Sequence, residues 1–352
     1  FMPQAESAAA SALAARPLRV MAADVLADRT PVQVLLLDNV NPVFATPVDW
    51  KVRDAMLKVP FRVSFGSFID DTSVLADLIL PDHSFLESWT DVRPEAGARV
   101  ALSTLAGPAM KPLYQTRATP DVLLDVARRL KQPLKPALPW QTFDQMLQAS
   151  VGDDNFATAT TQGWVELKAK AVGNGPQTAP GGRAQAAPVR DAVFDGDPTQ
   201  YPFYFLPFAS QAFLDGSLAH LPWLQEMPDP MSAAMWSTWG EVNPQTATRL
   251  GIGDGDVVEI ASGHGTLRAP VVLSPGTAPD VIAMPVGQGH ETFTRYASGR
   301  GANPVKVLAS AIEPETGALA WASTRVKASR VGGPDGRLIR FGGSMTEPDR
   351  HR

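Results

Sequence analysis

Residues 239–264 read WGEVNPQTATRLGIGDGDVVEIASGH, and this stretch decides the predicted fold. Asn243 is a good helix N-cap, and Pro244 suits the first helical position, where a backbone N–H would have no helical acceptor. Gly251 suits the left-handed residue that commonly ends a helix. A Gly-Asp-Gly-Asp turn then leads into an apolar strand at residues 257–261. The stretch therefore predicts a short helix, a tight turn and a strand.

Two further strands follow at short intervals. Residues 266–273 form the first, and their alternation puts on one face Leu267, Ala269, Val271 and Leu273. Residues 281–286 form the second, after a Gly/Pro turn and before a glycine-flanked polar tip at residues 287–290. Strands separated by turns every roughly eight to twelve residues favour a small β-barrel over an open parallel sheet.

The first part of the chain has a different pattern, in which strands alternate with helices. Residues 32–37 are a continuous apolar run, which is typical of a parallel strand covered on both faces. An amphipathic helix at 48–58 and strands at 61–65 and 77–80 follow. This alternation predicts a doubly wound parallel sheet. Residues 94–113 show neither pattern and are predicted to be irregular.

Two polar loops follow predicted strands of this sheet. The first contains Asn39, Asn41 and Pro42, and the second contains Asp70, Asp71 and Thr72. Open α/β sheets bind ligands at the carboxyl ends of their strands, so both loops are candidate nucleotide-binding segments on the same edge. The alternatives are an ordinary Asn-Pro turn for the first loop and helix capping for the second.

Composition limits the chemistry that the chain can carry. The net charge is −5 and the sequence lacks Lys/Arg clusters, which argues against a nucleic-acid surface. With no cysteine, the chain offers neither a thiolate zinc site nor a ligand for an iron–sulfur cluster. The five histidines lack metal-ligand spacing, and the sequence has no G-x-S-x-G elbow and no Walker lysine. No apolar run is long enough to span a bilayer.

Three stretches together resemble one known family. Residues 239–264, the run GQGHETFTRYASGRGANP at 287–304 and the run SFIDDTSVLADLILPDHSFLESW at 67–89 are similar to the C-terminal part of molybdopterin oxidoreductases of the dimethyl-sulfoxide-reductase superfamily. The similarity is greatest to the polysulfide-reductase-like large subunits and to quinone-linked respiratory complexes of the alternative complex III or menaquinone reductase type. The resemblance implies that the barrel is a double-psi β-barrel that binds molybdopterin dinucleotide.

The resemblance also implies a cofactor and a set of residues that hold it. The cofactor is a pair of pyranopterin guanosine dinucleotides that carry molybdenum, while the metal ligand and the iron–sulfur cysteines of the family belong to domains outside this sequence. The implied cofactor-binding residues are Asn39, Asn41, Pro42, Asp70, Thr72, Ser210, Gln211, Gln288, His290 and Asn303. A turn or cap role is the alternative for those in the two loops and for Gln288, His290 and Asn303. No catalytic residue and no metal ligand is predicted within the chain.

Two functions remain open from the sequence. The chain is either a portion of an oxidoreductase subunit that binds the cofactor and takes part in electron transfer to the quinone pool, or a cofactor-free structural subunit with the same fold. Expected partners are an iron–sulfur subunit and a quinone-binding membrane subunit of a redox complex. The expected location is the periplasmic face of the inner membrane, and the chain is expected to be a C-terminal fragment or a split subunit.

The expected domain organisation has five parts. A peripheral helical segment at residues 1–30 precedes a partial α/β molybdopterin-oxidoreductase domain at 31–172. A Gly/Pro-rich linker at 173–200 leads to the molybdopterin-dinucleotide-binding barrel at 201–331, and a charged tail closes the chain at 332–352.

Overall fold

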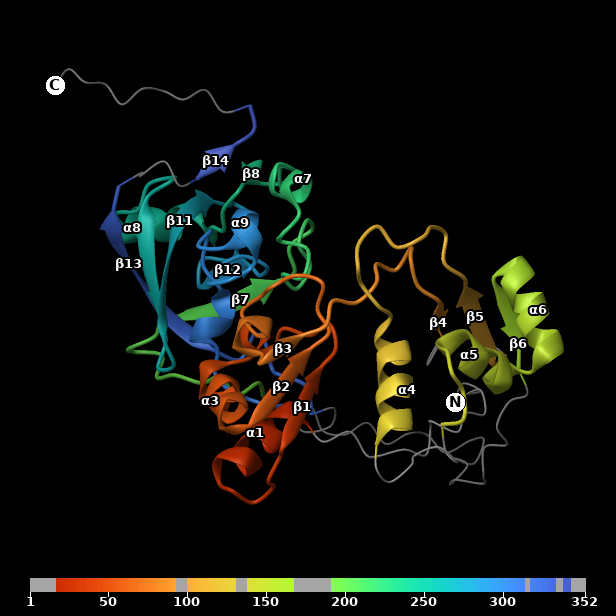
Figure 1. Cartoon of the computed structure of the whole chain (residues 1–352). Helices are drawn as coiled ribbons and strands as arrows, with labels where there is room; N and C mark the ends of the chain where they lie inside the picture. Colours follow the sequence, from red (N-terminus) through yellow and green to blue (C-terminus); the bar gives the residue numbers. More distant parts are fainter. Residues whose placement is uncertain are drawn as a thin grey trace, which may run out of the picture. The chain divides into compact units, whose positions relative to one another are not determined.

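The computed structural model describes residues 17–92, 100–130, 138–167, 191–313, 317–333 and 338–342 (Figure 1). Three predicted segments lie wholly or partly outside the described residues, namely the start of the peripheral helical segment, most of the linker and the end of the tail. The chain divides into two compact units. The barrel unit holds described residues 17–63, 68–78 and 191–342, and the sheet unit holds residues 64–67 and described residues 79–167.

The barrel unit begins with alternating helices and strands, shown in red and orange in Figure 1. In chain order they are α1 (Leu18–Leu26), β1 (Val34–Leu37), α2 (Pro42–Ala45), η2 (Val48–Trp50), α3 (Val52–Lys58), β2 (Phe61–Ser64), η3 (Ser73–Leu75) and β3 (Leu78–Ile79). The strands form one sheet in the order β1-β2-β3. A buried cluster joins α1 and α3 to β1, and its members include Ala22, Val25, Leu37, Ala55 and Met56. The predicted α/β class is confirmed.

Strand β1 departs from its predicted burial. Val34 and Leu36 are 53% and 50% exposed, whereas Leu37 is buried in the cluster with α1 and α3. The prediction that both faces of this strand are covered is therefore wrong for the described chain. The physical reason is that α1 and α3 pack on the face that carries Leu37, and successive side chains of a strand point to opposite faces.

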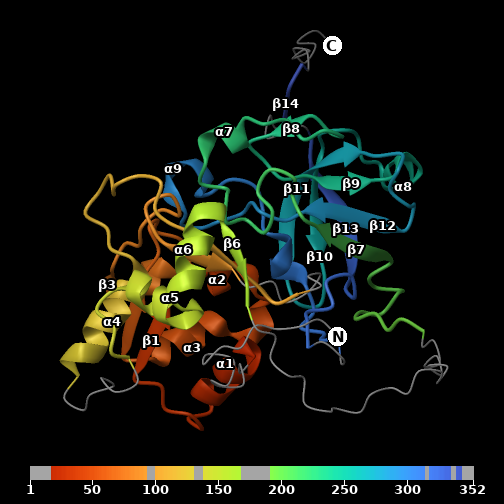
Figure 2. The same ribbon diagram turned by 90° about the vertical axis from the view of Figure 1, so that its right-hand side faces the viewer.

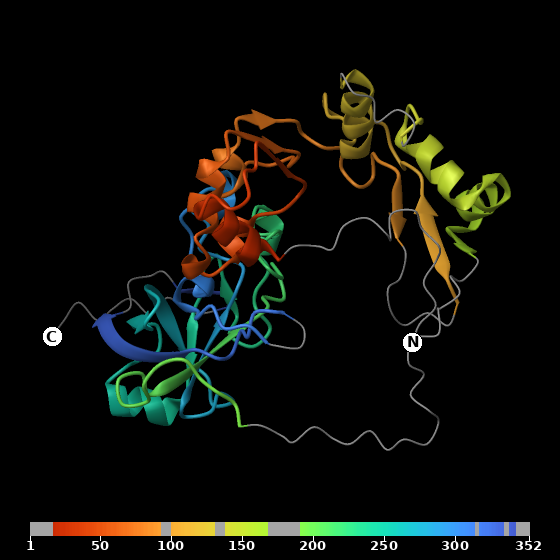
Figure 3. The same ribbon diagram turned by 90° about the horizontal axis from the view of Figure 1, so that it is seen from below.

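The second part of the barrel unit is a closed six-stranded barrel (Figures 1 and 2). Its strands are β7 (Phe203–Phe208), β9 (Gly240–Val242), β10 (Val257–Ala261), β11 (Thr266–Leu273), β12 (Val281–Pro285) and β13 (Arg325–Gly332). They close in the order β10-β11-β9-β12-β7-β13, and β13, drawn in blue, curves along the barrel in Figure 3. Two neighbouring pairs, β9 with β11 and β7 with β12, are parallel, and the other pairs are antiparallel. The predicted closed barrel is confirmed.

The local signals at residues 239–264 act as predicted. The Asn243 side chain accepts a hydrogen bond from the backbone N–H of Gln245, and helix α8 (Pro244–Leu250) begins at the next residue. Gly251 ends the helix in the left-handed region at φ 64°. Strands β10 and β11 then pair as a hairpin, with Val258 opposite Ala269 and Ile260 opposite Leu267.

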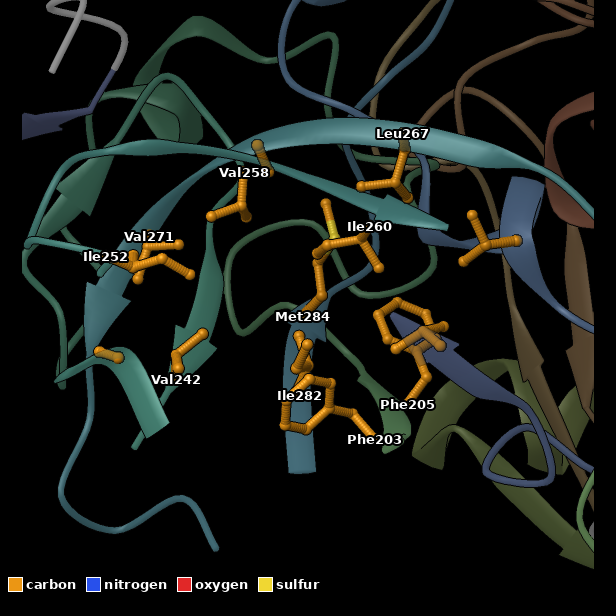
Figure 4. Close-up of a cluster of buried hydrophobic side chains, with 14 of the residues drawn as sticks. Phe203, Phe205, Val242, Ile252, Val258, Ile260, Leu267, Val271, Ile282 and Met284 are labelled. Carbon is orange, nitrogen blue, oxygen red and sulfur yellow. The ribbon is translucent and has the colours of Figure 1, made fainter. Parts of the chain in front are cut away.

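The barrel interior is filled by side chains. Figure 4 shows Val258 and Ile260 of β10 gathered with Ile282 and Met284 of β12 and with Phe205 of β7, and all five are fully buried. A dry interior of this kind holds the strands together through the hydrophobic effect. The loops at the barrel ends, rather than its interior, therefore supply the polar residues that matter for function.

The remaining described elements of the barrel unit are short. They are α7 (Pro222–Gln225), β8 (Ala234–Met235), α9 (Thr294–Ala297), η4 (Pro304–Val307) and β14 (Ile339–Arg340), which pairs with β8. Helix α9 follows the glycine-flanked tip at residues 287–290, and η4 begins directly after Asn303. Both therefore border the predicted cofactor segments.

The sheet unit contains an antiparallel sheet with helices. Its elements are β4 (Thr90–Val92), β5 (Leu102–Ala106), α4 (Thr119–Arg129), α5 (Phe143–Val151), α6 (Asp153–Gln162) and β6 (Trp164–Glu166), with the sheet order β4-β5-β6. Strand β5 lies within residues 94–113, so the prediction that this stretch is irregular is wrong in part. The short strand β5 gains its order from pairing with β6, about sixty residues later in the sequence. No helix among the residues that the structure describes is long and apolar enough to cross a membrane.

Candidate functional site

Most of the buried candidate residues meet in one hydrogen-bonded cluster within the barrel unit. Asp71 lies at its centre and its carboxylate accepts four hydrogen bonds. The Nδ1 atom of His290 donates at 2.6 Å, the backbone N–H groups of Glu291 and Thr292 donate at 2.7 and 2.9 Å, and the Asn41 amide donates at 3.2 Å. Both the loop after β2 and the tip after β12 therefore depend on this carboxylate.

The Asp71 carboxyl is held in its ionised form by these donors. Burial alone raises the pKa of Asp71, because a charged carboxylate loses hydration in the interior. The hydrogen bonds from His290, the Thr292 N–H and Asn41, together with the charge of His290, outweigh burial and lower the pKa below its ordinary value. The carboxylate is therefore part of the folded structure at neutral pH.

The imidazole of His290 is enclosed by aromatic rings. It stacks on Phe44 with ring centroids 3.7 Å apart and an interplanar angle of 11°. The centroid of the Phe293 ring lies 4.8 Å from that of the imidazole. The Nε2 atom lies 3.2 Å from the carbonyl oxygen of Gly216. His290 is only 2% exposed, so both of its ring nitrogens are used by protein groups.

Asn303 and Thr72 extend the cluster on either side. The Asn303 amide donates to the Phe44 carbonyl at 2.8 Å, and its side-chain oxygen caps η4 by accepting from Val305 N–H. The Thr72 hydroxyl donates to the Asn41 side-chain oxygen at 2.7 Å and accepts from Val43 N–H. Asn41, Thr72, His290 and Asn303 thus lie together, and each is bonded to a protein group.

Close backbone approaches, made at glycines, bring these segments together. A Cβ atom on Gly216, whose φ is 107°, would lie 2.6 Å from the Phe44 ring. A Cβ atom on Gly287 would lie 2.8 Å from Phe213, and one on Gly289 would overlap the backbone nitrogen of Asn303. The space beside all three glycines is therefore filled by the protein itself.

Gln288 belongs to a neighbouring buried pair. Its amide nitrogen donates to the Gln225 side-chain oxygen at 2.6 Å, and the Gln225 amide donates to the Ala219 carbonyl at 2.7 Å. The pair borders a cavity of about 30 Å³, whose lining also includes Ser210 and Gln211. A cavity of this size holds about two water molecules.

The other candidates lie at the margin of the cluster or outside it. Asn39 is exposed and has a left-handed backbone with φ 48°. Pro42 is the first residue of α2. The Asp70 carboxylate accepts from the backbone N–H groups of Thr72 and Ser73, which is the capping role that the sequence left open. The Ser210 hydroxyl accepts from Phe213 N–H.

Two residues that the cluster requires, Asp71 and Phe44, had no separate predicted role. Asp71 is adjacent to Asp70, and only one of two adjacent carboxylates can cap the same turn. This adjacency is the sequence signal that Asp71 binds a different partner. Phe44 follows the Asn-Pro element and provides both the stacking ring and the carbonyl that Asn303 binds. Its aromatic type alone indicates burial rather than this position.

These residues do not fit a pterin dinucleotide in the arrangement that the structure describes. A ligand of that size requires a pocket of several hundred Å³ with polar groups that are free to bind it. The candidates are already bonded to protein groups, Thr72 to Asn41, His290 to Asp71 and Asn303 to the Phe44 carbonyl. The cavity at Gln288 is about ten times too small. A larger open depression of about 630 Å³ lies elsewhere on the barrel, lined by Phe203, Arg249 and Lys327 among others, and it contains none of the candidates. Cofactor binding by the candidates stays a prediction.

Comparison with known proteins identifies the type of domain. Residues 228–324 match the family model described as "Molydopterin dinucleotide binding domain". This range covers β8 to β12, the tip that carries Gln288 and His290, and Asn303 before η4. The matched family is the one that the motifs at residues 239–264 and 287–304 predict.

Longer relatives extend the similarity over most of the chain. The molybdopterin-binding-like subunit of menaquinone reductase from Nitratidesulfovibrio vulgaris is 27% identical over 307 residues, which cover 85% of this chain and 42% of the relative. The molybdopterin-containing subunit ArrA of arsenate respiratory reductase from Shewanella sp. is 23% identical over 389 residues, covering 86% of this chain and 45% of the relative. The chain thus spans somewhat less than half the length of these relatives.

A solved structure supports the fold. Acetylene hydratase from Pelobacter acetylenicus superposes with a TM-score of 0.72 at 14% sequence identity, covering 89% of this chain and 46% of the other. The α/β segment, the closed double-psi β-barrel, the family match and the molybdopterin-type relatives agree with one another. The chain therefore belongs to the molybdopterin oxidoreductases of the dimethyl-sulfoxide-reductase superfamily and corresponds to the C-terminal part of their molybdopterin-binding subunit.

Proposed function

We propose that the chain is the structural, cofactor-free form of this C-terminal part in a quinone-linked reductase. One observation carries the proposal, which is that three residues implied by the resemblance as cofactor contacts, Asn41, His290 and Asn303, are bonded to protein groups, the first two through Asp71. Buried polar groups that are already satisfied gain little from a ligand and must lose their present bonds to accept one.

The close packing of the cluster also supports the proposal that this chain binds no cofactor there. The stacked Phe44 and His290 rings leave no room between them at 3.7 Å, and Gly216 and Gly289 are packed against protein atoms. To admit a planar pterin, the chain would have to separate these rings and break the hydrogen bonds of Asp71. Breaking a buried ionic pair of this kind typically costs about 3 to 5 kcal/mol.

A menaquinone reductase relative supports the quinone linkage. That relative is named a molybdopterin-binding-like subunit, and it aligns with 85% of this chain. The proposal therefore places the chain beside an iron–sulfur subunit and a quinone-binding membrane subunit, at the periplasmic face of the inner membrane. Co-purification from detergent-solubilised membranes tests the partners, and protease treatment of spheroplasts tests the side of the membrane.

Metal and pterin analysis tests the absence of the cofactor. The chain is purified in its native complex from cells grown with molybdate or tungstate, and both metals are measured together with the fluorescence of oxidised pterin. We expect less than about one tenth of an equivalent of metal and pterin per chain. A stoichiometric amount of either would contradict the proposal, and an Asp71→Asn variant then shows whether the cluster residues hold it.

A second candidate function is the binding of molybdopterin guanosine dinucleotide with participation in electron transfer. The family match over residues 228–324 favours it, because that family is defined by dinucleotide binding. In that case Gln288, His290 and Asn303 would supply polar contacts, while the bound metal would supply the redox chemistry. Stoichiometric pterin that falls in His290→Gln and Asn303→Ala variants, at unchanged protein yield, would establish this function.

A further inference from the structure

A second histidine joins distant parts of the barrel unit, outside the cluster of Asp71. His264 lies in the turn between β10 and β11, and its ring is placed between two carboxylates. Its Nδ1 atom is 2.6 Å from Asp49 Oδ2, and its Nε2 atom is 2.8 Å from Asp195 Oδ1. Ionised carboxylates only accept hydrogen bonds, so both bonds form only when each ring nitrogen carries a proton.

The three residues come from separate segments. Asp49 belongs to η2 in the α/β segment, Asp195 lies in the stretch that leads into β7, and His264 belongs to the barrel hairpin. The hairpin turn is itself fixed, because the Ser262 hydroxyl accepts from His264 N–H and donates to the Val307 carbonyl. The imidazole is therefore presented to both carboxylates by a rigid turn.

Solvent still reaches the group. The side chain of His264 is 21% exposed, and those of Asp49 and Asp195 are 44% and 47% exposed. Partial burial lowers the pKa of His264, but the hydrogen bonds and charges of Asp195 and Asp49 outweigh it and raise the pKa above 6.5. The ring can thus exchange its proton with water near neutral pH.

The other charged groups on the elements around His264 either bond to other protein groups or are neighbours of the three residues in the sequence. On η4, Lys306 pairs with Glu291, and on β13 the Arg325 guanidinium donates to backbone carbonyls of Tyr201 and Pro202. The Asp197 carboxylate accepts from Thr199. On β10 and β11, Glu259 pairs with Arg268, and Arg53 of α3 pairs with Glu291. Further ionisable residues near the three groups include Lys51, Asp54, Asp191 and Lys327. The acidic pair is thus what distinguishes the surroundings of His264.

We propose that His264 is a pH-dependent fastener that holds η2 and the stretch before β7 against the β10–β11 hairpin. The fastener is closed while the imidazole carries both protons, and it opens when one proton leaves. The segment α2–η2 is then held at one end by the buried bonds of Asn41 and Phe44, and at the other end by the titratable contact of Asp49. Loss of the proton frees only the second end.

The sign of the pH dependence follows from the raised pKa. A histidine whose pKa is higher in the folded state stabilises the fold fully below its unfolded pKa of about 6.5. That stabilisation is lost as the pH rises through the higher folded value. The fastener is therefore closed in acid and open in alkali.

Two measurements test the proposal. Titration of ¹³C,¹⁵N-labelled histidine rings by NMR should give a His264 midpoint above 6.5, which falls in Asp49→Asn and Asp195→Asn variants. Native-state hydrogen exchange should show protection of the Trp50 and Lys51 amides, which donate to Pro47 and Val48, falling between pH 6 and pH 9. Each unit by which the folded pKa exceeds the unfolded one corresponds to about a tenfold change in the opening equilibrium.

Matched variants separate the fastener from general effects of pH. His264→Gln should show the low protection at both pH values, whereas His83→Gln should keep the wild-type profile, because the His83 ring bonds to Thr116 in the sheet unit. If His264→Gln does not fold, Asp49→Asn at the exposed side of the contact provides the same comparison. A His264 midpoint at or below 6.5, or a protection profile that is the same in wild type and in these variants, would overturn the proposal.

Discussion

Two histidine–carboxylate contacts join the α/β segment to the barrel, and they differ in burial. The contact between His290 and Asp71 has side chains that are 1% and 7% exposed, whereas those of His264 and Asp49 are 21% and 44% exposed. The distance from Nδ1 to the carboxylate oxygen is 2.6 Å in both. Geometry alone therefore does not separate them, and their surroundings determine what each contributes.

The difference in burial gives the same chemical pair, a histidine and a carboxylate, two different effects on stability. Asp71 is also bonded by two backbone N–H groups and by Asn41, and His290 is stacked on Phe44, so the buried contact is one part of a network that is lost as a whole. The exposed contact has water as an alternative partner, so its loss costs little and it follows the pH. The buried contact makes a large contribution to the stability of the fold, and the exposed contact makes a small one that depends on pH.

The largest expected effect comes from breaking the buried contact. Asp71→Ala leaves the His290 ring, the Asn41 amide and two backbone N–H groups without their acceptor, so the free energy of unfolding should fall by about 3 to 5 kcal/mol. Asp49→Ala, its exposed counterpart, should change it by less than about 1 kcal/mol. Urea denaturation at pH 7, followed by circular dichroism, measures both. Equal losses in the two variants would remove the contrast between the contacts.

Acid titration sharpens the same comparison. Because the folded pKa of Asp71 lies below its ordinary value of 3.8, the carboxylate stabilises the fold fully above that pH and loses this effect as the pH falls through the lower folded value. Asp71→Asn should lack this acid-dependent loss, whereas the contribution of His264 disappears at the opposite end of the pH range.

The next effect concerns the backbone approach that allows the buried contact. A Cβ atom in Gly289→Ala would overlap the backbone of Ala302 and Asn303, at a residue with φ 91°, so the free energy of unfolding should fall by about 2 to 4 kcal/mol. Gly299→Ala is the control, because φ is 70° there and no atom lies within 4 Å of the added Cβ. It should show only the backbone cost of about 1 kcal/mol. If the two variants melt at the same temperature, steric contact at Gly289 has no role.

The sequence predicted the barrel well because its signals are local. Asn243, Pro244 and Gly251 set the ends of α8 by capping, and the strand β10 has the bounds that were predicted from composition. Interactions of this kind depend on residues within one turn of each other. The short spacing of the strands then favoured a small barrel, and the family resemblance implied its double-psi type.

The sequence predicted less where partners are distant. Val34 and Leu36 have the composition of a strand covered on both faces, but whether a second layer exists is decided by the rest of the protein and not by the strand. Strand β5 was missed because its five residues, which pair with β4 and β6, carry little pattern of their own. At the candidate site, the family resemblance grouped Asn41, His290 and Asn303 in one region. Their hydrogen-bond partners needed the structure, because His290 bonds to Asp71 and Asn303 to Phe44 across more than 200 residues.

The smallest expected effect tests the barrel turn that lies away from both contacts. Gly255 has φ 80°, and its N–H donates to the Val271 carbonyl, so the turn keeps β11 in register only with a left-handed residue at this position. Gly255→Val should lower the free energy of unfolding by about 1 to 2 kcal/mol, because a β-branched residue is strained at positive φ. Gly263→Val is the matched control, since its backbone is not left-handed and an added Cβ meets no atom within 4 Å. Thermal denaturation should show a lower melting temperature for the first variant alone. Because Gly255 lies at the opposite end of β10 from His264, the NMR titration midpoint of His264 should stay unchanged in Gly255→Val. A shift of that midpoint would mean that the turn before β10 and the exposed contact are coupled through the length of β10.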